Sequence, residues 1–158
     1  METAYLETSI FSFYYDERTA PEIVARKNWT RDFWENCRGR YLFSASPAVF
    51  NELSRGSKPH KEDALKLALT LPALEFVPAV REIAAVHMRH FVMPRDPLGD
   101  ALHLALACYH KCDYLVTWNC AHLANANKAG HIRRVNAMLD LRTPAMLTPL
   151  ELLGVASD

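Results

Sequence analysis

The amino-acid sequence predicts an α/β fold, a three-layer α/β/α sandwich with a mainly parallel central sheet. Short apolar runs, typical of buried strands, alternate with longer segments in which apolar residues recur every three or four positions, typical of helices. Strands that alternate with helices form parallel sheets covered by helices on both faces. The length of 158 residues suits one domain. We expect this domain to span residues 1–154, followed by a short tail at 155–158.

Strands are expected where short apolar runs end in turn or capping residues, at 4–6, 41–43, 74–77, 114–118 and 145–147. Pro78 ends the third of these runs. The run at 114–118 is apolar throughout, as in a strand that is buried on both faces of a parallel sheet. These runs supply the strands of the predicted sheet.

Helices are expected after Thr8 and Ser9, at 21–37, from 47 through 53, at 60–71, over 80–91, at 98–110 and in a last turn from 149. Ser46-Pro47 and Asp96-Pro97 each combine a capping side chain with a proline at the first helical position. Thr148 and Glu151 have the spacing of a capping box. The helix at 98–110 is apolar on nearly every side, so we expect it at the centre of the fold.

The charge balance limits the functions that the chain can have. It contains 18 basic and 18 acidic side chains, which excludes a polycation that binds nucleic acid over its whole surface. A local basic face beside an acidic pocket remains compatible with this balance. No apolar run reaches the ~20 residues of a membrane span, and the N-terminus lacks the pattern of a secretory signal. The expected location is therefore the cytoplasm, with no membrane partner.

The four cysteines contain no closely spaced C-x-x-C pair. We expect them to be small apolar thiols in a reducing compartment. The alternative is a zinc site built from Cys108, Cys112, Cys120 and His122. The spacing of these residues matches no closed four-ligand pattern.

Polar side chains follow the predicted strands, where parallel sheets place their binding sites. Glu7 follows the first strand and Asn119 follows the strand at 114–118. Glu52 lies one to two turns into the helix after the second strand, and Asp100 lies one turn into the apolar helix. His103 shares a helix face with Asp100. We expect His103 to be a hydrogen-bonded core residue, with assistance in catalysis or a contact to substrate as the alternative.

Three carboxylates and an amide at one sheet edge indicate a cation. A carboxylate on an apolar central helix is unfavourable to bury unless it is paired or bound to metal. Carboxylates that converge also repel one another, and a divalent cation relieves that repulsion. Because the ligands are hard oxygens, Mg²⁺ or Mn²⁺ is expected rather than zinc.

Four segments resemble a known family in order and spacing. They are Tyr5-Leu6-Glu7-Thr8-Ser9, Asn51-Glu52-Leu53, Gly99-Asp100-Ala101-Leu102-His103-Leu104-Ala105 and Leu115-Val116-Thr117-Trp118-Asn119. They resemble the motifs of PIN-domain proteins, with the nearest likeness to VapC-like toxins of type II toxin–antitoxin systems, over nearly the whole chain. The resemblance implies a small α/β/α nuclease that cuts RNA with Mg²⁺ or Mn²⁺. It also implies a homodimer and an antitoxin protein as partners.

The same resemblance implies roles for individual residues. The expected catalytic residues are Glu7, Glu52, Asp100 and Asn119, of which Glu7, Asp100 and Asn119 would hold the metal. The metal would polarise the phosphodiester and lower the pKa of a bound water. Thr8, Ser9 and Thr117 are expected to orient the carboxylates through hydrogen bonds.

Two positions depart from the family pattern. Glu7 stands where the family has aspartate, and Asn119 stands where aspartate is frequent. An asparagine carbonyl can ligate a hard cation, but it adds no negative charge. The alternative function is therefore a catalytically degraded PIN domain that only binds RNA or a protein.

Basic residues gather after two of the predicted site residues. Arg55, Lys58, His60 and Lys61 follow Glu52, and Lys128, His131, Arg133 and Arg134 follow Asn119. We expect both clusters to contact RNA phosphates, with Arg55, Lys58, Arg133 and Arg134 as the contact residues. The alternative for either cluster is a solvated helix face.

Each acidic or amide residue also has a purely structural explanation. Glu7 can cap the next helix, and Asp100 can stabilise a helix start through the helix dipole. Glu52 can pair with Arg55 on the helix surface, and Asn119 can be a turn residue.

Overall fold

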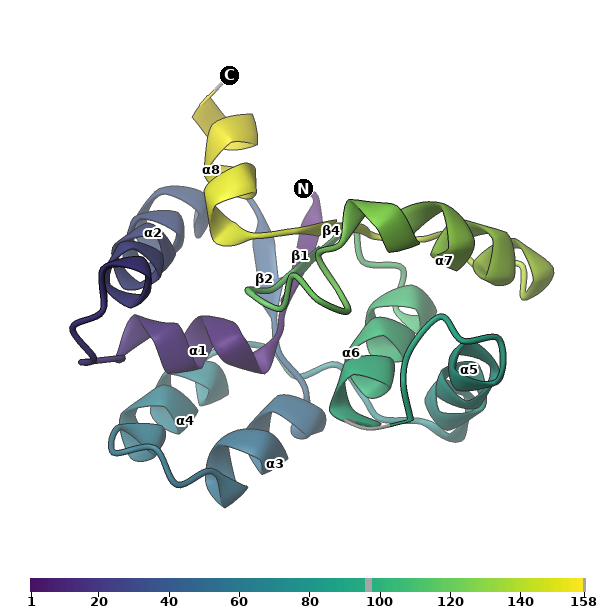
Figure 1. Ribbon diagram of the computed structural model, residues 1–158, viewed down its shortest axis with the longest axis horizontal. Coiled ribbons are helices and arrows are strands. Elements are labelled where there is room, and N and C mark those ends of the chain that lie inside the picture. The colour runs from purple at the N-terminus through teal and green to yellow at the C-terminus, as the bar shows by residue number, and fades with distance from the viewer. Residues whose placement is uncertain (96–97, 158) are drawn as a thin grey trace.

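A four-stranded parallel sheet forms the centre of the molecule in the computed structural model, which describes residues 1–95 and 98–157 (Figure 1). The strands are β1 (Thr3–Leu6), β2 (Leu42–Ser44), β3 (Tyr114–Val116) and β4 (Ala145–Leu147). Their order across the sheet is β2-β1-β3-β4. The register pairs Ala4 with Phe43 and Tyr5 with Leu115. The expected parallel sheet is confirmed.

Helices cover both faces of this sheet. They are α1 (Thr8–Tyr14), α2 (Pro21–Cys37), α3 (Pro47–Arg55), α4 (Lys61–Leu69), α5 (Pro78–Arg89), α6 (Leu98–Tyr109), α7 (Ala126–Met138) and α8 (Pro149–Ser157). In Figure 1, α1 and α2 lie to the left of the sheet, and α5 and α6 lie to its right. Helix α2 packs against α1 and α8, and α5 packs against α6. The expected three-layer α/β/α architecture is therefore confirmed.

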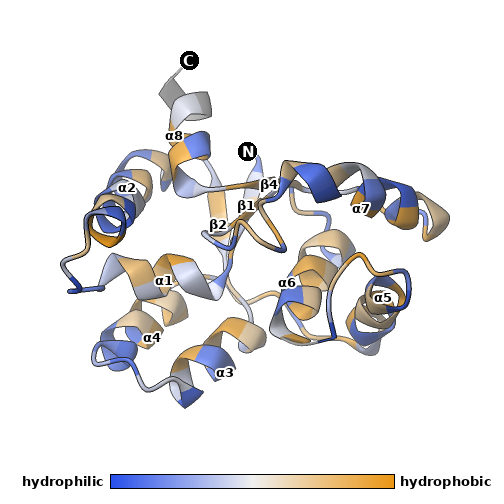
Figure 2. Ribbon diagram, viewed as in Figure 1, coloured by the Kyte–Doolittle hydropathy of each residue, from blue (hydrophilic) through white to orange (hydrophobic). Residues whose placement is uncertain are grey.

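The core lies where β1, β3 and α6 meet. Ala4, Tyr5 and Leu6 of β1 and Leu115 of β3 have no exposed surface. Helix α6 is buried along almost its whole length, as its apolar sequence predicts (Figure 2). Because α6 is central, the polar side chains that it carries are held rigidly against the sheet.

The last helix starts with the capping box that the sequence predicts, whereas α1 and α3 start without the predicted caps. Thr148 and Glu151 form the expected capping box, since each backbone N–H donates to the other side chain. The first helix, however, is capped by Glu7 rather than by Thr8 or Ser9. The Ser46 hydroxyl does not cap α3, because it lies 2.7 Å from the Tyr5 hydroxyl. The expected start at Asp96-Pro97 lies outside the described residues.

One predicted strand is wrong and one helix was not predicted. The segment 74–77 forms no strand, because Ala73 makes only a single bridge to Ala45 before Pro78 opens α5. Helix α8 continues through Ser157, into the expected tail. Helix α7 is missing from the expected elements. Its sequence is mostly polar, so it lacks the apolar periodicity that identifies the other helices.

A buried histidine away from the sheet edge makes stability depend on pH. His87 has no exposed surface, and its Nε2 lies 2.6 Å from Asn136 Oδ1. Within the described residues, its Nδ1 has no hydrogen-bond partner. Burial lowers the pKa of His87, and the Asn136 hydrogen bond opposes that shift only in part. The folded protein therefore holds His87 neutral at pH values where the unfolded chain is already protonated.

This difference predicts a loss of stability in acid. As the pH falls below about 6.5, the unfolded state gains a proton that folded His87 does not accept, so the free energy of unfolding decreases. Thermal unfolding between pH 7.5 and pH 5 should show a smaller acid-induced fall in melting temperature for His87→Gln than for the parent protein. Equal pH slopes in the two proteins would contradict this prediction.

Candidate functional site

The strand order of the sheet reverses between β1 and β3. From β1 the chain runs outward to β2, then crosses to β3 and continues to β4 on the other side. Open α/β sheets bind ligands in the crevice beyond the carboxyl ends of strands at such a reversal. Glu7 follows β1, and its backbone N–H donates to the Val116 carbonyl at the end of β3 (3.0 Å). The reversal therefore brings Glu7 beside Thr117 and Asn119.

Glu7 is buried and fully hydrogen-bonded, with 6% of its surface exposed. Its Oε1 accepts hydrogen bonds from the Ser9 and Thr117 hydroxyls, each at 2.6 Å. Its Oε2 accepts from the Ser9 backbone N–H at 3.1 Å, which caps α1. The expected contacts of Ser9 and Thr117 with a carboxylate are present, and Glu7 also has the capping role that was its structural alternative.

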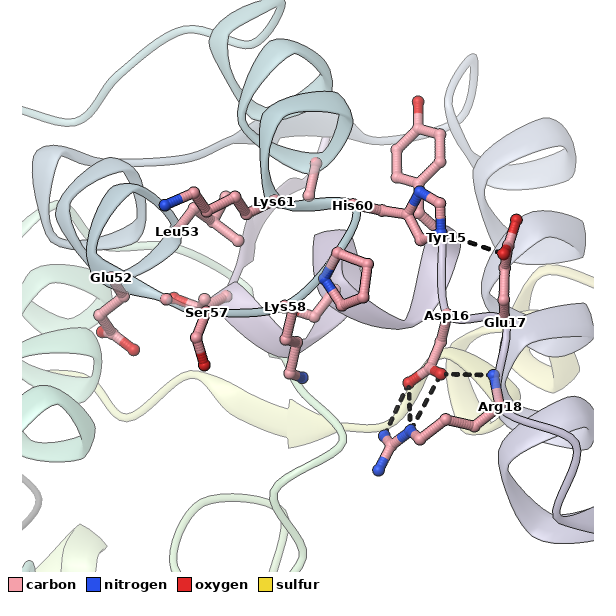
Figure 3. A pocket seen from close by; sticks show the side chains of 15 residues that line it. Tyr15, Asp16, Glu17, Arg18, Glu52, Leu53, Ser57, Lys58, His60 and Lys61 are labelled. Carbon is pink, nitrogen blue, oxygen red and sulfur yellow. Dashed lines mark hydrogen bonds and ion pairs between the residues drawn. The ribbon is translucent and has the colours of Figure 1, made fainter.

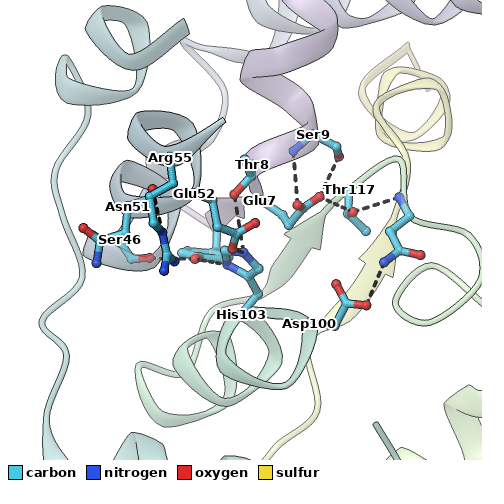
Figure 4. A network of polar contacts seen from close by, with 12 residues as sticks. Glu7, Thr8, Ser9, Ser46, Asn51, Glu52, Arg55, Asp100, His103 and Thr117 are labelled. Atoms are coloured by element: carbon cyan, nitrogen blue, oxygen red, sulfur yellow. Dashed lines mark hydrogen bonds and ion pairs between the residues drawn. The ribbon is translucent and has the colours of Figure 1, made fainter. Parts of the chain in front are cut away.

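Glu7 lies between Glu52 and Asp100, and the Asp100 carboxylate accepts a hydrogen bond from Asn119 (Figure 4). Asn119 Nδ2 donates to Asp100 Oδ2 at 3.0 Å. Asp100 is 7% exposed. Burial raises the pKa of Asp100, and the charge of Glu7 raises it further, while the Asn119 hydrogen bond opposes both. Burial and the neighbouring Glu7 carboxylate therefore both make the ionised form of Asp100 less favourable.

The Asn119 amide faces Asp100 as a donor and not as an oxygen ligand. Its Oδ1 accepts the backbone N–H groups of Ala121 and His122, at 3.2 and 3.1 Å, so its NH₂ group is the end directed at Asp100. Two N–H groups on one oxygen fix the orientation of the amide. The metal-ligand role expected for Asn119 is not what this placement offers. The turn role, its structural alternative, is present.

The loop that carries Asn119 is anchored by Trp118. The Trp118 backbone N–H donates to Ser9 Oγ at 2.9 Å, and its indole N–H donates to Thr30 Oγ1 at 2.8 Å. Trp118 also stacks on Trp29, with ring centroids 6.1 Å apart. An aromatic anchor in the core therefore holds the end of β3, and with it Asn119, in place.

Glu52 and His103 form a pair that the sequence did not predict. His103 Nε2 lies 2.5 Å from Glu52 Oε1, and His103 Nδ1 lies 2.6 Å from the Tyr5 hydroxyl. His103 is 1% exposed, so its expected place as a hydrogen-bonded core residue is confirmed. Thr8 Oγ1 also approaches His103 Nε2, at 3.4 Å. Thr8 thus serves the Glu52 side of the site rather than Glu7.

The pair favours charge on both partners. Burial alone would lower the pKa of His103, but the Glu52 hydrogen bond and the nearby carboxylates raise it above its ordinary value. Burial would raise the pKa of Glu52, but the hydrogen bond and charge of His103 hold it below its usual range. The hydrogen bond to His103 therefore favours the ionised form of the Glu52 carboxylate and fixes its position.

Gly99 lets Glu52 approach α6. A Cβ atom at Gly99 would lie 2.9 Å from Glu52 Oε1 and 3.3 Å from Glu52 Cδ. Real Cβ atoms do not tolerate the first distance, so any side chain at position 99 would displace the Glu52 carboxylate. Only glycine allows the carboxylate to lie against the first turn of the helix that carries Asp100.

This contact predicts a selective loss of activity in Gly99→Ala. The displaced atom is the end of a flexible side chain, so the melting temperature should change little. Misplacing Glu52 should still lower activity by about 10- to 100-fold. Thermal unfolding and cleavage rates measured on the same preparation separate the two effects. Gly154→Ala is the matched control, since nothing lies within 4 Å of a Cβ there.

Glu7, Glu52 and Asp100 form an acidic corner beyond the sheet, and it has the side chains of a cation site. Glu7, Glu52 and His103 each offer a ligand atom within 4.8 Å of the others. Glu7 lies between the Glu52–His103 pair and Asp100 (Figure 4). His103 is already engaged by Glu52 and Tyr5 through both ring nitrogens, so the donors left for a cation are carboxylate oxygens. Hard oxygen donors fit Mg²⁺ or Mn²⁺.

A cavity of about 710 Å³ extends from the Glu52 side of this corner (Figure 3). It lies between α1, α3 and α4, with Glu52 at one end and Asp16 and Arg18 at the other. Lys58 lines the cavity, and the charge of Arg55 contributes to the lowered pKa of Glu52. The first predicted basic cluster therefore borders the site.

The second predicted cluster lies farther out. Arg133 and Arg134 are exposed on α7, which runs away from the sheet (Figure 1). Two residues nearer the site were not predicted as a contact pair. His122 follows the Asn119 turn, and its Nδ1 lies 3.5 Å from Lys128 Nζ.

The cysteines do not join a metal site within residues 1–95 and 98–157. Cys108 and Cys112 are buried, and burial raises the pKa of these thiols to about 12 and about 11. Neutral thiols are poor zinc ligands. Over the same residues, no helix combines the length and the apolar character that a membrane span requires.

A scan against protein-family models finds no match for this chain, and no curated protein matches it.

Proposed function

We propose that the protein is a metal-dependent endoribonuclease that hydrolyses RNA phosphodiester bonds at the corner formed by Glu7, Glu52 and Asp100. The supporting observation is the burial of Glu7 and Asp100 close together, where the charge of one raises the pKa of the other. Buried like charges are unfavourable, and a divalent cation between them removes the repulsion. The position beyond the carboxyl ends of β1 and β3 agrees with a binding site.

The side chains of the corner have distinct roles in this proposal. Glu7 and Asp100 would hold the cation, which would supply Lewis-acid stabilisation of the charge that develops on the phosphate. Asn119 holds one oxygen of Asp100, and Ser9 and Thr117 hold Glu7. Glu52, ionised and fixed by His103, would orient the attacking water by accepting its hydrogen bond. Arg55 and Lys58 would bind phosphates beside the cut.

The resemblance to VapC-like proteins extends the proposal to the role of the protein in the cell. We infer a toxin of a toxin–antitoxin pair that acts on cytoplasmic RNA, forms a homodimer and is neutralised by an antitoxin protein. Induction of the protein in a bacterial host should then arrest growth, and the Asp100→Asn variant should not. Growth arrest of equal strength in the two cultures would separate toxicity from cleavage.

The test of the central proposal is cleavage of single-stranded RNA with Mg²⁺, with Mn²⁺ and with a chelator. The parent protein should cleave only in the presence of a cation, and Asp100→Asn should be inactive. Asp140→Asn is the control, because Asp140 is exposed beyond α7 and its left-handed backbone suits asparagine. Single-stranded DNA of the same sequence tests selectivity. Full activity in Asp100→Asn would refute the proposal.

One observation favours the alternative function. The carboxylates already receive hydrogen bonds from Ser9, Thr117, Asn119 and His103, and the last site position holds an amide where an acid would add charge. A cluster satisfied in this way fits a degraded PIN domain that binds RNA or a protein without cutting. Calorimetric titration with Mg²⁺ distinguishes the two functions: heat of binding supports the nuclease, and RNA binding without cation uptake or cleavage supports the binding module.

A further inference from the structure

Phe91 is a large apolar residue in an unfavourable place. It has a φ of 58° and is 87% exposed. It follows the end of α5, where its N–H donates to the Met88 carbonyl and the Val92 N–H donates to the His87 carbonyl. This is the position after a helix at which glycine is favoured, because glycine has no Cβ to strain the left-handed conformation.

The fold does not explain the phenylalanine. Lys111 and Asp140 occupy the equivalent left-handed positions after α6 and α7, but they are polar and gain solvation there. Val92 and Met93 are buried and hold the turn, whereas the Phe91 ring projects into solvent. An exposed aromatic ring on a strained backbone suits a stacking surface for a ligand.

The surroundings of Phe91 are basic. Arg89 and Arg95 are exposed on either side of it, and the segment 88–95 contains no acidic residue. His131 of α7 lies against the same turn, with its Nε2 2.7 Å from the His90 carbonyl oxygen. Phe91 therefore stands beside the middle of α7.

A row of basic side chains connects this turn to the acidic corner. Asn119 contacts Asp100 through its amide and the His122 N–H through its oxygen. His122 in turn lies 3.5 Å from Lys128 Nζ. Lys128, His131 and Arg134 then follow at every third position of α7, each about 60° round the helix from the one before. Hydrophilic residues alternate with apolar ones along this helix (Figure 2).

Arg134 lies nearer to His131 round α7 than Arg133 does, at about 60°. A Cβ at Gly130 would lie 3.5 Å from an Arg134 guanidinium nitrogen, so Arg134 folds back along α7 towards its N-terminal half. Arg133 is about 160° round the helix from His131, at 3.6 residues per turn. The sequence treats the two arginines as one cluster, and the helix separates them.

Building on the proposed nuclease function, we propose that single-stranded RNA leaves the acidic corner along the row Lys128, His131 and Arg134 and stacks a base on Phe91. Lysine and arginine side chains bind phosphates, and an aromatic ring binds any base through its face. Single strands are the RNA form whose bases are free to stack on a side chain. The row thus defines a substrate longer than the nucleotides at the cut.

The test is binding of a fluorescent dodecameric oligouridylate to Asp100→Asn protein, into which further substitutions are introduced. Phe91→Ala should weaken binding by about 5- to 100-fold, the range for loss of one stacked base. Arg134→Glu should weaken binding and reduce its salt dependence. Arg133→Glu, the same change one residue away, should weaken binding less than Arg134→Glu does. Binding that neither Phe91→Ala nor Arg134→Glu alters would overturn the RNA row.

Cleavage separates this proposal from the proposed function. In protein with Asp100 intact, Phe91→Ala should slow cleavage of the dodecamer and leave cleavage of a trinucleotide unchanged. If the parent cleaves both and Phe91→Ala changes neither, the row is wrong and the nuclease stands. If the parent cleaves neither but binding falls in Phe91→Ala, the nuclease is wrong and the row stands.

Phe91→Gly provides a readout that a structural role would not produce. Glycine relieves the left-handed strain, so the melting temperature should rise by a few degrees while RNA binding falls. A lower melting temperature with unchanged RNA binding would assign Phe91 to the fold and overturn the proposal. Unchanged RNA binding with loss of self-association would assign Phe91 to a protein contact and would overturn it equally.

Discussion

Asp100→Asn should make the metal-free protein more stable while it abolishes cleavage. The pKa of Asp100 is raised by burial and by the charge of Glu7, so its ionised form destabilises the folded state at neutral pH. That destabilisation is relieved as the pH falls through the raised pKa, because the folded state then takes up a proton more readily than the unfolded chain. Asparagine removes the charge permanently and keeps an oxygen that can accept the Asn119 hydrogen bond.

The metal-free variant should therefore have a higher melting temperature than the metal-free parent protein. The cleavage rate should fall by about a hundredfold or more, as when a main electrostatic group of an active site is removed. Mg²⁺ should raise the melting temperature of the parent protein, and this increase should vanish in the variant. Stability and activity therefore change in opposite directions at one residue.

Asp113→Asn is the matched control with the opposite expectation. Asp113 accepts the Thr3 backbone N–H at 2.8 Å and an Arg142 guanidinium N–H at 3.0 Å, and these contacts lower its pKa. The same chemical change should therefore lower the melting temperature at position 113 and leave cleavage intact. A lower melting temperature for Asp100→Asn as well would show that Asp100 is a stabilising charge and would contradict the electrostatic account of the corner.

The second large effect is expected at the Glu52–His103 pair. His103→Gln removes the imidazole that hydrogen-bonds both the Glu52 carboxylate and the buried Tyr5 hydroxyl. Loss of a buried charged hydrogen bond of this kind destabilises by about 2 kcal/mol, or ~4–8 °C here. Cleavage should fall at least about tenfold, because Glu52 loses the partner that holds it towards the corner.

A double-mutant cycle isolates the pair. The cycle compares Glu52→Gln, His103→Gln and the double variant by chemical denaturation. The Glu52 side chain is 34% exposed, so solvent screening should limit the coupling to about 1–2 kcal/mol. Additive effects of the two substitutions would show that the pair contributes no coupling, and His103 would then stabilise the core through Tyr5 alone.

Local patterns account for the parts of the fold that the sequence predicts correctly. Helix α2 and strand β4 have the predicted limits, since proline, periodicity and an apolar run mark them. The segment 74–77 reads as a strand by composition, but pairing needs a partner edge, and only Ala73 reaches one. Helix α7 is held by a few buried residues and by Asn136 contacts, which no local pattern announces.

The contacts of the site also divide into those that the sequence predicts and those that depend on the tertiary structure. Glu7 meets Thr117 because both follow neighbouring parallel strands, and the strand ends are visible in the sequence. The Glu52–His103 contact joins residues on two helices, α3 and α6, and depends on the close approach at Gly99. The orientation of the Asn119 amide depends on a turn that only the structure shows.

Glu7 has two roles, as the N-cap of α1 and as a carboxylate of the acidic corner. The same carboxylate begins α1 and faces the acidic corner, so a ligand that draws its Oε2 away from the Ser9 N–H removes the cap of that helix. Ligand occupancy and the local opening of the first turn of α1 are thus linked equilibria. The Ser9 amide, through its hydrogen exchange, is a reporter of ligand occupancy that the fold itself contains.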